Sequence, residues 1–230
     1  MAELKDIYAL IKKEQPKLLS KQDNPNKHLH GFDLPFRMVV VGPSGSSKTS
    51  FVANLLLTFC EGKGTFQSIS IVTKCADEPI YSWLKTKSNS IVVSEGMSTL
   101  PKLNLENFPK GSQSLVILDD LQGSKDQSAV EDYYVRCRKL GCSIVFIAQN
   151  WYKISPVVRG NANYVALLKM SGQRDCKAVL SELSAGLSRE KLMELYHYAV
   201  STKGTPLIID LAAPMETKFR KGFNETLRVD

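Results

Sequence analysis

Residues 37–51 read RMVVVGPSGSSKTSF, and their order of residue types predicts a strand, a loop and a helix. The run 38–41 is apolar and β-branched, so we expect a buried strand there. A loop of small residues follows, and Lys48 and Thr49 then open a segment with helical spacing of apolar residues. This order is the P-loop pattern, in which backbone N–H groups surround phosphate oxygens. The residues expected to line the phosphates are Gly42, Pro43, Ser44, Gly45, Ser46, Ser47, Lys48, Thr49 and Ser50.

Within this loop, Lys48 is expected to reach the β- and γ-phosphates, and the Thr49 hydroxyl to bind Mg²⁺. The pattern G-x-x-x-x-G-K-[ST] has glycine where this chain has Ser47. We expect Gly42 and Gly45 to serve any backbone positions with positive φ, and Ser47 to be tolerated at the start of a helix. The alternative is a glycine–serine turn without a ligand, which leaves the spacing of Lys-Thr after a strand unexplained.

Two further apolar runs end in polar side chains. Residues 114–120 read SLVILDD, which predicts a buried strand with Asp119 as the Mg²⁺ partner and Asp120 as the base or water-orienting group. Residues 143–149 read SIVFIAQ and end in Gln149, which would point into the phosphate crevice and contact the γ-phosphate or the attacking water. The alternative for Gln149 is a polar residue at a strand exit.

The chain alternates strands and helices, which predicts one α/β domain with a mostly parallel sheet and helices on both faces. Any nucleotide should lie at the carboxyl ends of the strands. We divide the chain into a helix with its connector, a P-loop core and a basic tail, at 1–35, 36–212 and 213–230. The terminal helix, at 3–15, is expected to pack on the core, or else to dock on a neighbouring subunit. Further strands are expected at 67–73, 91–93, 164–169 and 207–211, and further helices at 78–87, 130–140, 175–182 and 188–200.

Net charge, cysteine content and the lack of long apolar runs limit the kinds of partner and compartment that we expect for this protein. The net charge of +7 in 230 residues is compatible with a polyanionic partner such as DNA. Five cysteines without zinc-type spacing indicate free thiols in a reducing, intracellular compartment. No apolar run approaches the length of a membrane span, and the first residues are too charged for a signal peptide, so we expect no membrane association.

Four segments together resemble a known family. They are GPSGSSKT at 42–49, LVILDD at 115–120, RKLGCSIVFIAQN at 138–150 and WYKISPVVRGNANY at 151–164. They resemble the DNA-packaging ATPases of poxviruses, giant viruses and virophage-like viruses, within the FtsK–HerA superfamily of P-loop NTPases. The resemblance implies a RecA/FtsK–HerA-like fold that uses ATP and Mg²⁺ to pump double-stranded DNA into a capsid. It also implies a homo-oligomeric ring, a pentamer or hexamer, that meets the capsid portal or vertex in the virion, virus factory or host cytoplasm.

The resemblance also assigns an arginine. The spacing from Arg138 through Gly141 to Gln149 resembles the segment that supplies an arginine finger and a sensor glutamine in FtsK-type motors. Arg138 would therefore act on the nucleotide of the neighbouring subunit, with Arg136 and Arg159 as reserves. Position alone favours a solvated base at a helix end as the explanation of Arg138. The chain departs from the family pattern at Ser47 and at Asp120, where glutamate is commoner.

Three alternatives stay open beside the motor. A P-loop phosphotransferase, such as a nucleotide or small-molecule kinase, needs the same phosphate and metal groups. A nucleotide-binding scaffold without motor activity would explain the two departures from the pattern. A GTP-dependent switch is disfavoured, because no guanine-reading [NT]-K-x-D motif follows the D-x-x-G at 120–123. The DNA-contacting residues suggested by charge alone are Lys153, Lys169, Arg174 and Lys177.

Overall fold

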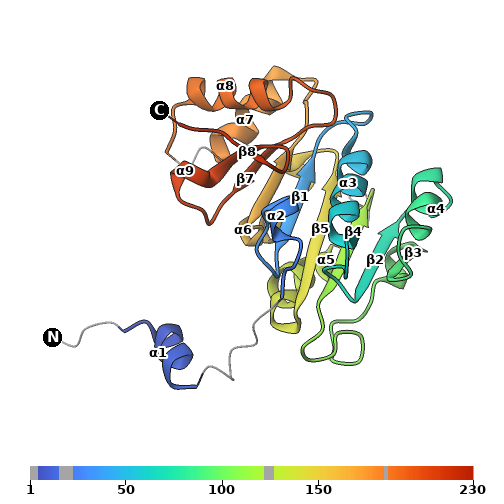
Figure 1. The fold of residues 1–230 in the computed structure, drawn as a ribbon. Helices are drawn as coiled ribbons and strands as arrows, with labels where there is room; N and C mark the ends of the chain where they lie inside the picture. Colours follow the sequence, from blue (N-terminus) through green and yellow to red (C-terminus); the bar gives the residue numbers. More distant parts are fainter. Residues whose placement is uncertain (1–4, 16–22, 122–126, 184–185, 230) are drawn as a thin grey trace.

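The computed structural model describes residues 5–15, 23–121, 127–183 and 186–229. Its described part contains one nine-stranded sheet with helices on both faces (Figure 1). The strands are β1 (Arg37–Val41), β2 (Ser68–Thr73), β3 (Ile91–Glu95), β4 (Ser114–Asp119), β5 (Cys142–Ala148), β6 (Tyr164–Leu167), β7 (Leu207–Asp210), β8 (Phe219–Lys221) and β9 (Glu225–Thr226). The α-helices are α1 (Ile7–Glu14), α2 (Lys27–His30), α3 (Lys48–Cys60), α4 (Pro79–Lys85), α5 (Ser128–Arg136), α6 (Pro156–Asn161), α7 (Gln173–Glu182), α8 (Arg189–Ala199) and α9 (Met215–Lys218). Short 3₁₀ turns are η2 (Met97–Thr99), η3 (Cys137–Leu140) and η4 (Trp151–Lys153).

The strand order is β3-β2-β4-β5-β1-β6-β7-β8-β9. The first six strands in this order run parallel, and β7, β8 and β9 continue the sheet in antiparallel pairs. The prediction of a mostly parallel α/β sheet is therefore confirmed. Because β1, β4 and β5 are neighbours and parallel, the segments that follow them meet at one edge of the sheet.

Alternating side chains of the central strands enter two separate cores. Val39 and Val41 of β1 pack in a cluster with α5, α6, α7 and α8. Met38 and Val40 face the other side, where α3, α4 and the aromatic residues Phe32 and Phe36 cover the sheet. This is why the predicted buried strands lack a polar face.

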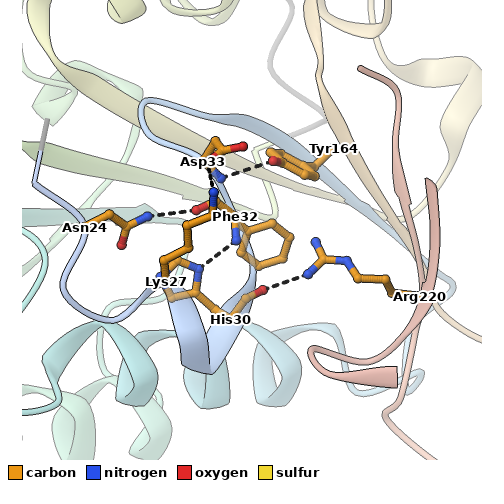
Figure 2. Close-up of polar contacts among 7 residues, drawn as sticks. All are labelled: Asn24, Lys27, His30, Phe32, Asp33, Tyr164 and Arg220. Carbon is orange, nitrogen blue, oxygen red and sulfur yellow. Dashed lines mark hydrogen bonds and ion pairs between the residues drawn. The ribbon is translucent and has the colours of Figure 1, made fainter. Parts of the chain in front are cut away.

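The segment that precedes β1, residues 23–36, is here called the N-terminal strap. Its buried Asn26 donates from Nδ2 to the carbonyl oxygens of Phe59 and Glu61, at 3.3 and 3.0 Å, at the end of α3. Figure 2 shows the other end of the strap, where Arg220 of β8 donates from Nη1 to the His30 carbonyl oxygen at 3.0 Å. The same guanidinium lies over the Phe32 ring, 4.7 Å from its centroid. The strap therefore joins the P-loop helix to the C-terminal strands.

Three elements differ from the sequence-based expectation. No residue of α1 is buried, and Figure 1 shows the helix away from the sheet, so the expected packing on the core is not found. The helix expected at 130–140 ends as an α-helix at Arg136 and continues as the 3₁₀ turn η3. The segment set apart as a tail carries α9, β8 and β9, so the sheet continues beyond β7.

Two expectations from composition can be compared with the described residues. Across the described ranges, no helix has both the length and the apolar character that crossing a bilayer demands. All five cysteines are free thiols.

Candidate functional site

The loop between β1 and α3 starts with a glycine that has no room for a side chain. A Cβ at Gly42 would lie 2.5 Å from Ser46 Oγ and 3.1 Å from Leu168 Cβ. The Gly42 N–H continues the sheet by donating to the Ala148 carbonyl oxygen of β5 at 3.2 Å. Gly45 takes a positive φ of 76°, as expected for a tight loop. The loop is thus folded closely back on itself at the end of the central strand.

Ser47 does not behave as expected. Its φ of 72° and ψ of 30° lie in the left-handed region, and its side chain makes no capping hydrogen bond to α3. The expectation that glycines alone would take positive φ, with Ser47 at an ordinary helix start, is therefore wrong. A left-handed conformation costs a residue with a Cβ about 1–2 kcal/mol. Glycine takes positive φ without that cost, so the residue that the P-loop pattern has at this position would avoid it.

Lys48 faces a cavity of about 330 Å³ at the carboxyl edge of the sheet. The cavity is lined by the loop, the first turn of α3 and the residues that follow β4 and β5. Lys48 Nζ donates to the Pro43 carbonyl oxygen at 2.9 Å, so the side chain folds back over the loop. Burial lowers the pKa of Lys48, and the carboxylates of Asp119 and Asp120 oppose this shift. The lysine thus lies where phosphate oxygens would replace a weaker carbonyl partner.

Asp119 and Thr49 form the second part of this cavity. Asp119 is the last residue of β4 and is buried, and its Oδ2 accepts from the Thr49 hydroxyl at 3.2 Å. The buried Tyr81 hydroxyl of α4 donates to the same oxygen. Burial raises the pKa of Asp119, while the hydrogen bonds from Tyr81 and Thr49 oppose the shift. The predicted pair is therefore assembled, and the tyrosine is an addition to it.

These oxygens fit a magnesium ion. Mg²⁺ prefers oxygen ligands and is usually held by one or two carboxylates together with substrate phosphates and water. Among the described residues, no group of three or more His, Cys, Asp or Glu side chains forms a complete protein cage for a metal. A hydroxyl and a single buried carboxylate beside a phosphate loop suit the metal that accompanies a nucleotide.

Asp120 and Gln149 meet across β4 and β5. The Gln149 amide Nε2 donates to Asp120 Oδ1 at 3.1 Å. Lys74 Nζ lies 3.9 Å from Asp120 Oδ2, and about half of each of these two side chains is exposed. Asp120 has a positive φ of 53°, which turns the chain immediately after Asp119. The two predicted water-handling residues thus share one wall of the cavity.

Arg138 lies at the opposite edge of the sheet. It belongs to η3, directly before β5, whereas Gln149 follows the other end of that strand. Seven residues at about 3.3 Å each separate the two edges by ~23 Å. Arg138 lines a separate cavity of about 350 Å³ with Lys110 and Lys139. It therefore cannot contact a nucleotide in the cavity of its own chain.

Arg159, one of the two reserves, is held within its own subunit. Its Nη1 donates to Glu182 Oε2 at 3.1 Å, and its guanidinium lies 5.6 Å from the Trp151 ring centroid. Trp151 Nε1 donates to the same glutamate oxygen at 2.8 Å. Only 18% of the Arg159 side chain is exposed. These contacts tie η4 and α6 to α7, which favours a packing role for Arg159.

Two residues at this site were missed in the sequence. Tyr81 lies 38 residues from Asp119, and Lys74 lies 46 residues from Asp120, so neither pair forms a local motif. Lys74 directly follows β2, and residues that follow parallel strands gather at the same edge, which is a signal that could have found it. Tyr81 carries no such signal, because in the sequence it is one of several apolar residues of a helix that packs in the core.

The fold matches viral and bacterial ATPases. The genome packaging NTPase B204 from Sulfolobus turreted icosahedral virus 2, in complex with AMPPCP, superposes with a TM-score of 0.57 and 17% identity over 78% of this chain and 94% of that chain. B204 from Sulfolobus turreted icosahedral virus, described as a DNA-packaging ATPase, gives 0.55 and 14% over 78% and 94%. EssC (ATPases 2 and 3) from Geobacillus thermodenitrificans gives 0.55 and 12% over 77% and 38%. These similarities confirm the P-loop NTPase fold.

The sequence itself gives a more specific result. No curated protein matches it. The model of the family described as Poxvirus A32 protein matches residues 27–211, a range that begins in the strap and includes the P-loop, Asp119, Gln149 and Arg138. The expected resemblance to poxvirus-type proteins is thereby confirmed over most of the chain. The protein belongs to the poxvirus A32 protein family.

Proposed function

We propose that this protein is an ATPase that drives double-stranded DNA into a viral capsid. Membership of the A32 family and the shared fold with viral packaging ATPases support this function. The observation that carries it is the convergence of Lys48, Thr49, Asp119, Asp120 and Gln149 on one cavity at the carboxyl edge of the sheet. Lys48 supplies a positive charge for the phosphates, and Thr49 with Asp119 supplies oxygen ligands for a metal. Asp120 and Gln149 supply polar groups for the attacking water.

The first part of the mechanism is the binding of the triphosphate. Backbone N–H groups of the loop and of the first turn of α3 would donate to the phosphate oxygens. The Lys48 ammonium neutralises the β- and γ-phosphates. Thr49 and Asp119 would hold Mg²⁺, which withdraws charge from the same phosphates when bound. Tyr81 fixes the orientation of the Asp119 carboxylate through its hydroxyl.

The second part is the attack by water. Asp120 Oδ1 and the Gln149 amide are 3.1 Å apart and together offer an acceptor and a donor to one water molecule. That water attacks the γ-phosphorus, its proton passes to Asp120, and the bond between the γ-phosphorus and the leaving ADP oxygen breaks. Asp120 is shorter than glutamate, and its left-handed backbone brings the carboxylate to the Gln149 side.

The third part requires a neighbour. Because Arg138 lies at the far edge of its own sheet, an arginine finger at this position acts only on the nucleotide of an adjacent subunit. Such head-to-tail contacts generate rings when the rotation closes, which agrees with the proposed pentamer or hexamer. The ring would enclose DNA and meet the capsid portal or vertex, in the virion or in the virus factory of the host cytoplasm.

ATP hydrolysis by the purified protein, with and without double-stranded DNA, tests this function. We expect DNA to stimulate hydrolysis, and Lys48→Ala to reduce it by ~10²-fold or more, since electrostatic stabilisation of this kind has that magnitude. Lys63→Ala removes an exposed lysine beyond the end of α3 and should leave the rate unchanged. A rate indifferent to DNA, with the γ-phosphate transferred to an added small acceptor, would instead identify a phosphotransferase.

A further inference from the structure

A second cavity adjoins the phosphate cavity across the start of α3. Its volume is about 430 Å³, within the range of small-molecule sites. Ser47 and Ser50 line both cavities, so the two are neighbours at the first turn of the helix. The other walls come from residues 203–206, in the loop before β7, and from residues 222–223, in the β8–β9 turn. None of the site residues expected from sequence lies on those two walls.

The direction of a bound triphosphate follows from the first cavity. Lys48 and the Thr49–Asp119 pair mark the β- and γ-phosphates, close to Gln149. Ser50 lines both cavities whereas Gln149 lines only the first, so a triphosphate with its γ end near Gln149 has its α end toward Ser50. Whatever is attached to the α-phosphate therefore leaves past Ser50, into the second cavity. Another cavity of similar volume touches the loop at Ser44 and Gly45 but includes no residue of α3.

The walls of the second cavity suit a flat ring. Phe223, half-buried in the β8–β9 turn, stacks on the buried Phe51 of α3 with ring centroids 5.3 Å apart and planes at 27°. Pro206 adds a buried apolar wall. The backbone of the turn is held as well, because Arg220 Nη1 donates to the Phe223 carbonyl oxygen at 3.2 Å. A rigid aromatic surface is the usual means of binding a nucleobase without reading its edge.

Polar groups at the rim suit a sugar. Asn54 Nδ2 donates to the Ser50 carbonyl oxygen at 2.8 Å, so Oδ1 is the atom that Asn54 can offer to a ribose hydroxyl. Lys203 is exposed and lines the cavity, where its charge would favour the α-phosphate. The cavity thus has an apolar base wall and a polar sugar wall, next to a phosphate site.

We propose that this cavity binds the base and ribose of the nucleoside triphosphate, and that Phe223 is the aromatic contact of the base. The assignment rests on the proposed function, in which the adjoining cavity binds the triphosphate. It gives the C-terminal strands a direct part in substrate binding.

The test compares a ligand that has a base with one that has none. Dissociation constants are measured for ATP and for inorganic tripolyphosphate, both with Mg²⁺, on the full chain. Phe223→Ala should weaken ATP binding at least about fivefold, the lower limit for loss of one base–aromatic contact. Tripolyphosphate binding should not change, because the phosphate cavity is intact. Phe223→Leu keeps apolar volume against Phe51, which preserves folding, and removes the aromatic face. It should also weaken ATP binding and leave tripolyphosphate binding unchanged.

Controls separate this inference from the proposed function. Tyr198→Ala removes an aromatic ring from α8 that contacts Glu225 of β9 but is not among the residues lining the cavity, and it should bind both ligands normally. Lys48→Ala should weaken both ligands. Wild-type ATP affinity in both Phe223 variants, or an equal loss for ATP and tripolyphosphate, would overturn the base assignment. Retention of both ligands by Lys48→Ala would count against the phosphate site instead.

Discussion

Replacing Arg138 with alanine tests whether each ATP site is completed by the adjacent subunit. Arg138 precedes β5 and Gln149 follows it, which places about 23 Å between the two edges. A hydrogen bond to phosphate needs about 3 Å. Any direct effect of Arg138 on hydrolysis must therefore pass through a neighbour.

The expected size of the effect is large. Loss of an arginine finger costs ~10³–10⁵ in rate, or roughly 4–7 kcal/mol. ATP affinity should stay at the wild-type value, because the phosphate cavity of the same subunit is intact. Arg136→Ala is the matched control: Arg136 forms an exposed pair with Asp132 at 3.6 Å, and such pairs contribute about 0–1 kcal/mol. The control should hydrolyse ATP nearly as the wild type does.

The assay mixes Arg138→Ala subunits with Lys48→Ala subunits and measures hydrolysis without DNA. In randomly mixed rings, about one interface in four pairs an intact P-loop with an intact arginine. We therefore expect up to about a quarter of the wild-type rate, from two proteins that are each inactive. No recovery, with mixed rings confirmed by native mass spectrometry, would refute the assignment across the interface. A full rate in Arg138→Ala alone would reduce Arg138 to a surface charge.

Three further predictions concern single residues. Asp119→Asn should weaken Mg²⁺-dependent ATP binding, while Asp120→Asn should spare binding and slow hydrolysis; nucleotide titrations with and without Mg²⁺ check this, and equal losses would show that the roles are misassigned. Ser47→Gly should raise the free energy of unfolding by up to ~1.5 kcal/mol, since it removes a left-handed strain of about 1–2 kcal/mol and adds a glycine entropy cost of about 0.5–1 kcal/mol; urea unfolding measures it, and a destabilised variant contradicts it. Burial, and then the charge of Arg220, lowers the pKa of His30 from 6.5 to about 4. His30 therefore contributes stability that is present above pH 6.5 and is lost as the pH falls toward 4, by about 3 kcal/mol at most. Unfolding curves of the wild type and His30→Gln at several pH values check this, because only the wild type should show that component.

The strands and the loop could be predicted because their signals are local. The apolar run of β1, the small residues of the loop and the Lys-Thr pair lie within fifteen residues of each other. Parallel strands bring their carboxyl ends to one edge, so Asp119 and Gln149 could be placed beside the loop from connectivity alone. The same reasoning would have placed Arg138 at the other edge, because it precedes the strand that Gln149 follows.

The remaining features depend on contacts between distant segments. Tyr81 reaches Asp119 only because α4 packs against α3 and β3 in the same core as β4, and no spacing encodes that contact. Strands β8 and β9 contain three and two residues, too few for an alternating pattern to show. The left-handed backbone of Ser47 is not visible in its residue type, since serine is common at helix starts in the ordinary conformation.

The double role of Arg220 sets a limit on how far this protein can be trimmed. One guanidinium nitrogen donates to the His30 carbonyl oxygen in the strap (Figure 2). The same nitrogen donates to the Phe223 carbonyl oxygen in the β8–β9 turn. A fragment chosen from the sequence motifs alone, 36–212, would discard all three of these residues. It would also uncover Phe59, whose ring packs in the core against His30 of the strap with centroids 4.7 Å apart. The smallest soluble enzyme that an experimenter can expect to express therefore begins before the strap and ends after β9, although every catalytic motif lies between them.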